Sequence, residues 1–272
     1  KHKFFVDYKD ENVKKLLILA LPIIFGVAVN QINQLIDKNL ASFISVRGIS
    51  VLSYSVKLNE FVWGILVVSI VTSIFPTLSK LAIESRQKFK VQIAKTLSTI
   101  IYLVTPACVG ILIFSKEIVT LIFKRGKFDE NDVILVSGVL FYYAIGLIGL
   151  GIRDVLSNAF YALKMTRIPL INSVEMVILN VISSIILSRF MGLNGLALGS
   201  SIATIFGAIN LYIKLEKQIG KIKTKAIINN GKKVLISVIS MALVSKLVFI
   251  VLSMKLSSNL SFVIALLFAG LT

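Results

Sequence analysis

The stretch VILVSGVLFYYAIGLIGLGI, residues 133–152, contains no charged side chain. As an α-helix its length is about 30 Å. The hydrocarbon core of a bilayer is also about 30 Å thick, and a segment inside it must satisfy its own backbone hydrogen bonds. The run lacks the strict alternation of a barrel strand. It therefore predicts a membrane-spanning helix, and similar runs occur on both sides of it.

Six further runs are long and apolar enough to cross a bilayer, and an eighth run begins at residue 260. The six are 16–36, 59–82, 92–115, 169–188, 194–214 and 233–254. The sequence therefore predicts an all-α fold, a polytopic membrane helical bundle of about seven complete transmembrane helices plus a truncated eighth. The final run, LSFVIALLFAGLT (260–272), would reach only about 20 Å as a helix, and the first residue is Lys1 rather than Met. We expect a fragment of a longer protein.

The composition supports a membrane protein and argues against a nucleic-acid-binding one. Of the 272 residues, 56% are hydrophobic and 16% charged, and the mean hydropathy is +0.90, which is too apolar for an ordinary soluble domain. The net charge is +17. The cations lie between apolar runs instead of forming one polar face, so we expect no nucleic-acid partner.

The distribution of Lys and Arg predicts how the bundle is oriented. Four segments, 1–15, 80–95, 153–167 and 214–233, hold twenty of the 30 basic residues. Cytoplasmic connections of membrane proteins carry the excess of Lys and Arg. We therefore expect these four segments in the cytoplasm. In the segment 116–132, four cations are balanced by four carboxylates, which gives no inward bias.

Polar side chains near the predicted spans are the candidates for a functional cavity. An ionisable group at membrane depth costs a few kcal/mol, so it normally faces a partner, the bundle interior or a watery cavity. The candidates are Asn33 and Asp37 at the end of the first span, Lys57 and Glu60 at the start of the second, and Glu175 within the fifth. An equally open alternative is that Lys57 and Glu60 mark the outer membrane surface and form an i,i+3 pair.

No residue pattern indicates an enzyme, a cofactor or a metal site. The single cysteine, Cys108, lies inside an apolar run and is expected to be inert packing, and the single histidine, His2, lies in a charged terminal stretch. A histidine base beside a nucleophile and a glycine-rich phosphate loop are both missing from the sequence. The glycines of AIGLIGLGI (144–152) follow no strand and are expected to serve helix packing.

Four blocks, in this order, carry a resemblance to a known family. They are QLIDKNLASFIS (34–45), SYSVKLNEFVWGILVVSIVTSIFPTLSKLA (53–82), LIFKRGKFDENDV (121–133) and FYALKMTRIPL (160–170). Together they resemble the C-terminal portion of the MurJ (MviN) lipid II flippases, within the superfamily of multidrug and oligosaccharidyl-lipid/polysaccharide exporters. No one block is specific, but their shared order and spacing are.

The resemblance implies a fourteen-helix, two-lobed transporter in the bacterial inner (plasma) membrane, with this chain forming the seventh helix onward and the N-terminal lobe missing. In that frame residues 1–15 are a cytoplasmic inter-lobe linker and 16–215 the second lobe. Residues 216–232 are then a cytoplasmic basic loop and 233–272 a truncated last helix pair. The implied partners are membrane lipids and the cargo, an undecaprenyl-pyrophosphate-linked peptidoglycan precursor (lipid II), moved to the outer leaflet by alternating access.

The resemblance also implies a site residue. Lys57 occupies the place of a functionally important basic residue, usually arginine, and is expected to bind the cargo pyrophosphate in the cavity. Glu60 matches an acidic position and is expected to be a counter-ion. The chain departs from the family pattern at Val56 and Met165, where acidic residues are common. The alternatives are a flippase for another polyprenyl-linked polysaccharide, a multidrug exporter of the same superfamily, or a non-transporting membrane fragment.

Overall fold

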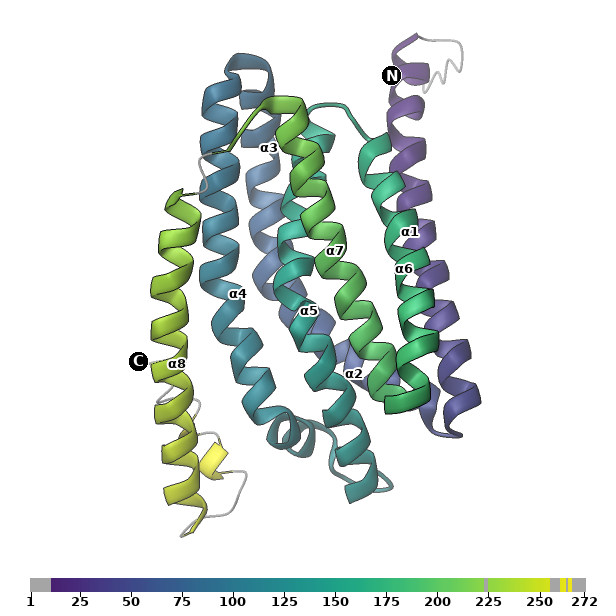
Figure 1. The fold of residues 1–272 in the computed structure, drawn as a ribbon, viewed down its shortest axis with the longest axis vertical. Helices are drawn as coiled ribbons and strands as arrows, with labels where there is room; N and C mark the ends of the chain where they lie inside the picture. Colours follow the sequence, from purple (N-terminus) through teal and green to yellow (C-terminus); the bar gives the residue numbers. More distant parts are fainter. Residues whose placement is uncertain (1–10, 223–224, 255–259, 263, 266–272) are drawn as a thin grey trace, which may run out of the picture.

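The computed structural model describes residues 11–222, 225–254, 260–262 and 264–265, and within them every regular element is a helix (Figure 1). The elements in order are α1 (Glu11–Ile44), α2 (Gly48–Trp63), η1 (Gly64–Val68), α3 (Ser69–Glu84), α4 (Arg86–Phe123), α5 (Glu130–Ala162), α6 (Arg167–Met191), α7 (Leu193–Ile219) and α8 (Lys225–Ser253). The helix η1 is a π-helical turn that joins α2 and α3 into one continuous span.

All seven predicted spans are confirmed, because among the described residues seven helices are long and apolar enough to cross a membrane. Several of them extend further than predicted. The first continues through Ile44, and the second begins at Gly48 instead of residue 59. Asp37 and Lys57 therefore lie within spanning helices and not at their ends. Most of the predicted eighth span and of the predicted linker 1–15 falls outside the described residues.

Helix α5 lies at the centre of the bundle and packs against α2, α4 and α7, while α6 packs between α1 and α7. At the edge of the bundle α8 lies along α4, and α1 lies on the opposite side (Figure 1). A side chain on Gly146 of α5 would come within 2.8 Å of the Ser201 backbone of α7. Glycine on α5 thus allows these two helices to pack closely, as the sequence predicted.

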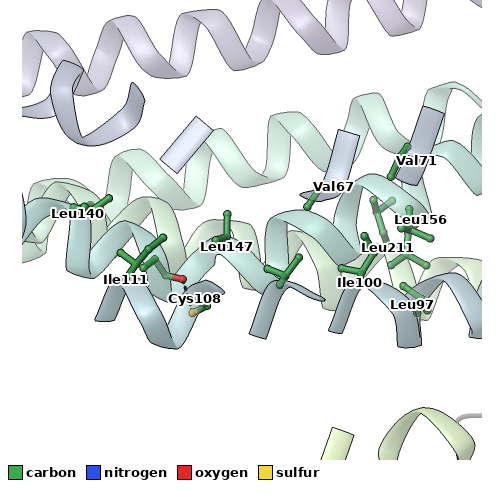
Figure 2. Close-up of a cluster of buried hydrophobic side chains, with 14 of the residues drawn as sticks. Val67, Val71, Leu97, Ile100, Cys108, Ile111, Leu140, Leu147, Leu156 and Leu211 are labelled. Atoms are coloured by element: carbon green, nitrogen blue, oxygen red, sulfur yellow. Dashed lines mark hydrogen bonds between the residues drawn. The ribbon is translucent and has the colours of Figure 1, made fainter. Parts of the chain in front are cut away.

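The hydrophobic core runs along the contact of α4 and α5 with α2, α3 and α7 (Figure 2). Leu140, Leu147 and Leu156 are fully buried on α5, and Ile100 is fully buried on α4. The thiol of Cys108 is buried and donates to the Ala144 carbonyl at 3.0 Å. Its predicted role in packing is confirmed.

The backbone departs from α-helix at places other than the prolines. Pro22, Pro76 and Pro106 lie inside α1, α3 and α4, and each helix continues past its proline. The departures are the π-helical turn at Gly64–Val68 and non-helical angles at Phe114 (φ −117°, ψ 21°). A proline disturbs the turn that precedes it, so Pro76 and Pro106 do not account for either departure.

The connection between α5 and α6 is much shorter than predicted. Helix α5 continues to Ala162 and α6 begins at Arg167, so the predicted connection 153–167 is wrong over its first ten residues. Arg153 lies inside α5 with a side chain only 11% exposed, and Lys214 lies inside α7. Both residues were counted to predict the orientation, and both lie within spanning helices.

Candidate functional site

A pocket of about 360 Å³ opens between α1, α2 and the middle of α5. Three of the five predicted site residues, Asp37, Lys57 and Glu60, line it. The full lining consists of Gln34, Asp37, Lys38, Leu52, Ser53, Val56, Lys57, Glu60 and Tyr143. Residues distant in sequence come together here because α1 and α2 are joined by a short turn and pack on each other, and α2 packs on α5.

Lys57 is an exposed cation inside a span, about 13 Å along the helix from Gly48. It makes no hydrogen bond or ion pair with any residue that the structure describes. The i,i+3 pair with Glu60, which the sequence left open as an alternative, is therefore not formed. The ammonium group is left facing the pocket, where it can interact with an anion.

Asp37 is the buried ionisable residue among those that line the pocket, with 6% exposure. Its carboxylate accepts hydrogen bonds from the Asn180 amide at 3.0 and 3.1 Å and from the Ser200 hydroxyl at 3.2 Å. The same amide donates to Asn33 Oδ1 at 2.8 Å. Asn33 thus joins the site behind the pocket, and the network connects α1 to α6 and α7.

Glu175 does not reach the pocket. It lies on α6 facing α7, where it pairs with Lys214 at 2.9 Å and accepts a hydrogen bond from Asn210. Its side chain is 37% exposed. The structure therefore places this candidate in a separate interhelical ion pair.

Sequence reasoning missed Lys38 and Tyr143 as members of the site. Lys38 directly follows Asp37 inside the first of the four family-like blocks, which was an available signal. Tyr143 carried no such signal, because it lies in the middle of an uncharged apolar run. The pocket combines two lysines with two carboxylates, of which Asp37 is held by the amide of Asn180.

A second polar cluster was also missed, since its charged residues, Arg153 and Asp154, were assigned to the predicted connection 153–167. Trp63 donates its indole N–H to Asp154 at 2.8 Å. The neighbouring Arg153 donates to the Ser173 hydroxyl at 2.8 Å and lies 3.9 Å from Asp154. This cluster joins α2, α5 and α6 next to the π-helical turn. Its position suits a structural role in holding these helices together.

At the end of the bundle where α1 turns into α2, an ion pair fixes the start of α5. Arg47 donates to Asp129 at 3.2 Å and to Asp132 at 2.8 Å. The Asp129 side chain also accepts from the Asp132 backbone amide, which caps α5. The Asp132 amide and then Arg47 hold the pKa of Asp129 below its usual value. The same two carboxylates raise the pKa of Arg47.

Comparison with known proteins identifies the family. A family model described as "Lipid II flippase MurJ" matches residues 1–268. A probable lipid II flippase MurJ of Vibrio cholerae is 32% identical over 212 residues, which are 78% of this chain and 40% of that protein. A probable lipid II flippase MurJ of Thermotoga maritima is 31% identical over 195 residues, which are 72% of this chain and 40% of that protein. The chain thus spans about two fifths of the length of these relatives.

Solved structures agree with this assignment. A lipid II flippase MurJ in an inward closed conformation superposes with a TM-score of 0.80 and 27% identity, over 99% of this chain and 54% of that one. An outward-facing multidrug resistance transporter of the MATE family shares only the fold, with a TM-score of 0.67 and 11% identity over 94% of this chain and 62% of that one. With seven spans and bacterial relatives, the protein is a multi-pass protein of the bacterial inner membrane. The chain belongs to the MurJ family of lipid II flippases.

Proposed function

We propose that this chain forms the second lobe of a flippase that moves lipid-linked peptidoglycan precursor from the cytoplasmic to the outer leaflet. The observation that carries the proposal is Lys57 itself. It lines a pocket at the depth of a spanning helix, in a chain of this family, and has no hydrogen bond or ion pair with any residue that the structure describes. A pyrophosphate-linked cargo is an anion, and it must lose water to enter a membrane protein. A fixed cation in a region of reduced dielectric compensates part of that loss.

The other groups of the pocket fit the same role. Asp37 makes its hydrogen bonds with Asn180 and Ser200, so it leaves Lys57 free for the cargo. Lys38 adds a second positive charge in the same pocket. Lysine provides a point charge and lacks the bidentate fork of arginine. We therefore infer that the site recognises the charge of the pyrophosphate more than its geometry.

Transport would proceed by alternating access, with this lobe forming one wall of the central cavity. An inward-open state takes up the headgroup, the two lobes rock about the cavity, and an outward-open state releases it. In this proposal the segments 1–15 and 216–232 lie in the cytoplasm and 233–272 form the last helix pair. The segment 16–215 holds the cavity wall.

The experiment is complementation of bacterial cells depleted of their own lipid II flippase, using a full-length flippase that carries this sequence. The variants are Lys57→Arg and Lys57→Ala, with Lys217→Ala as a matched control because Lys217 is an exposed cation at the end of α7. The proposal expects rescue by the parent, the arginine variant and the control, and no rescue by the alanine variant at equal membrane levels.

Two outcomes would contradict the proposal in different ways. Rescue by Lys57→Ala equal to the parent would show that Lys57 is not needed to bind the cargo. Failure of a well-expressed parent would instead favour another polyprenyl-linked cargo or an exporter of drugs. A transport assay with those cargoes would then separate the two alternatives.

A further inference from the structure

A second and larger pocket, of about 610 Å³, lies at the end of the bundle where α1 turns into α2. It is formed by the start of α2, the connection between α4 and α5, and the start of α5. Its lining consists of Arg47, Ser50, Val51, Tyr54, Phe123, Arg125, Lys127, Phe128, Asp132 and Val136. On α2 it uses a different face from the Lys57 pocket, because the two pockets share no lining residue.

The cations around this pocket fall into two groups. Arg47 is paired with Asp129 and Asp132, while Lys116 and Lys124 are both paired with Glu130. These three cations therefore have their charges balanced by neighbouring carboxylates.

Arg125 and Lys127 form the second group. Neither side chain has a hydrogen bond or an ion pair with any residue in the described ranges. Gly126 between them has a φ of 61°, a backbone conformation that suits glycine, and the Phe128 amide donates to the Arg125 carbonyl to close the turn. This turn carries two uncompensated positive charges into the lining of one pocket.

Three aromatic side chains form a cluster in another part of the pocket lining. The ring of Tyr54 lies 4.8 Å from that of Phe123 and 5.5 Å from that of Phe128, measured between centroids, and the two phenylalanine rings are 5.9 Å apart. Tyrosine is enriched at the ends of membrane spans, at the level of the lipid headgroups. A ligand of this pocket would therefore meet charge on one side and an apolar surface on the other.

We infer that this pocket binds the phosphate group of a membrane amphiphile. Two free cations suit a group with more than one negative oxygen, and arginine offers the fork that phosphate accepts. The acidic side chains nearby already balance other cations, so they leave Arg125 and Lys127 for an external anion. The phosphate belongs either to a phospholipid headgroup or to a pyrophosphate-linked prenyl chain. The site is separate from the Lys57 pocket and does not depend on the proposed transport cargo.

The experiment measures protection of a cysteine reporter inside the pocket. Ser50→Cys is introduced together with Cys108→Ala into the full-length protein in detergent, and its rate of reaction with a methanethiosulfonate reagent is followed. The probes are dihexanoyl phosphatidylglycerol, farnesyl pyrophosphate and farnesol, which has the prenyl chain without phosphate. Ser42→Cys, exposed on α1 at the same end of the bundle and outside the pocket lining, serves as the control reporter.

The phosphate-bearing probes are expected to slow labelling of Ser50→Cys about tenfold at ten times their Kd, without slowing labelling of Ser42→Cys. Protection by only one of them identifies the source of the phosphate, and protection by both shows that the shared group suffices. If neither probe slows the reaction, or if farnesol slows it equally, the inference is wrong.

Variants of Arg125 and Lys127 provide a second test in the same labelling experiment. Arg125→Gln/Lys127→Gln is expected to raise the probe concentration for half protection about tenfold or more, because charge-assisted hydrogen bonds are lost. The charge-matched control Lys217→Gln/Lys221→Gln is expected to change it less than twofold. Lys57→Ala should leave the protection intact, so failure of the transport proposal is distinguishable from failure of this one. Unchanged protection in the Arg125/Lys127 variant would overturn the inference.

Discussion

Asn180 on α6 donates its side-chain amide to both carboxylate oxygens of Asp37 on α1, at 3.0 and 3.1 Å. Both residues are buried, with exposures of 1% and 6%. The oxygen of the same amide accepts hydrogen bonds from the hydroxyls of Ser184 and Ser200. A buried carboxylate is stable only with such partners. The contact therefore joins α1 to α6 through groups that need each other inside the bundle.

Replacing Asn180 by alanine is expected to destabilise the protein by about 1–3 kcal/mol, because the Asp37 carboxylate loses its amide donor while still buried. The measurement is the thermal-unfolding midpoint in detergent, followed by circular dichroism. Asp37→Asn should cost less, since it removes the charge that needs the donor. The double variant should lose less stability than the sum of the losses in the two single variants. Strict additivity would show that the contact contributes nothing.

Two glycine-to-alanine variants should change stability in opposite directions. A Cβ on Gly195 would lie 2.4 Å from the carbonyl of Leu187, which is backbone of α6 and cannot move away easily. Gly195→Ala is therefore expected to cost about 1–3 kcal/mol through overpacking. A Cβ on Gly110 of α4 meets no atom within 4 Å, so Gly110→Ala should stabilise by about 0.5–1 kcal/mol. Equal midpoints for the two variants would contradict the close packing of α6 on α7.

The membrane spans could be predicted from the sequence because each needs only a long apolar run, and local hydropathy records that directly. The ends of the spans could not. The helix beginning at Gly48 includes the polar residues Lys57, Asn59 and Glu60, which a hydropathy reading assigns to the boundary. Arg153 was assigned to a loop for the same reason, although it packs beside Asp154 and Ser173 inside the bundle.

The pocket was predictable only in part. Asp37, Lys57 and Glu60 are ionisable residues close to apolar runs. Placing such residues in lipid is energetically unfavourable, so the sequence alone indicates them as candidates. Serine hydroxyls and Tyr143 can lie at membrane depth with little free-energy penalty, so nothing in the sequence indicates them. Glu175 was a candidate because it is an ionisable residue at membrane depth. Its charge is balanced by Lys214 on the neighbouring helix. Only the packing of α6 on α7 shows this pair.

The cap at the start of α5 predicts a dependence of stability on pH. The pKa of Asp129 is lowered in the folded protein by the Asp132 amide and Arg47. A lowered carboxyl pKa contributes stability that is present above the usual value, about 3.9, and is lost as the pH falls through the lowered value. Asp129→Ala should therefore unfold at a lower temperature than the parent at pH 7. The difference should shrink once the pH is below the lowered pKa of Asp129, because the protonated side chain keeps its acceptor oxygen for the cap but loses its charge for Arg47.

Asp129→Asn is the control for the cap, because asparagine also caps helices but has no charge for Arg47. Its midpoint at pH 7 should lie between those of the parent and of Asp129→Ala. A difference between parent and Asp129→Ala that stays constant from pH 7 into acid would mean that the charge of Asp129 has no part in the cap.

Lys38 is expected to contribute to cargo binding, because it lines the same pocket as Lys57 and has no hydrogen bond or ion pair with any described residue. Lys38→Ala should weaken binding of radiolabelled lipid-linked precursor to the purified full-length protein by about tenfold, the cost of one charge-assisted hydrogen bond. Lys38→Arg should keep most of the affinity, since it keeps the charge. Lys217→Ala, at the end of α7, provides the control for a change in net charge. If Lys38→Ala binds as tightly as this control, Lys38 takes no part in cargo binding and Lys57 alone provides the positive charge of the site.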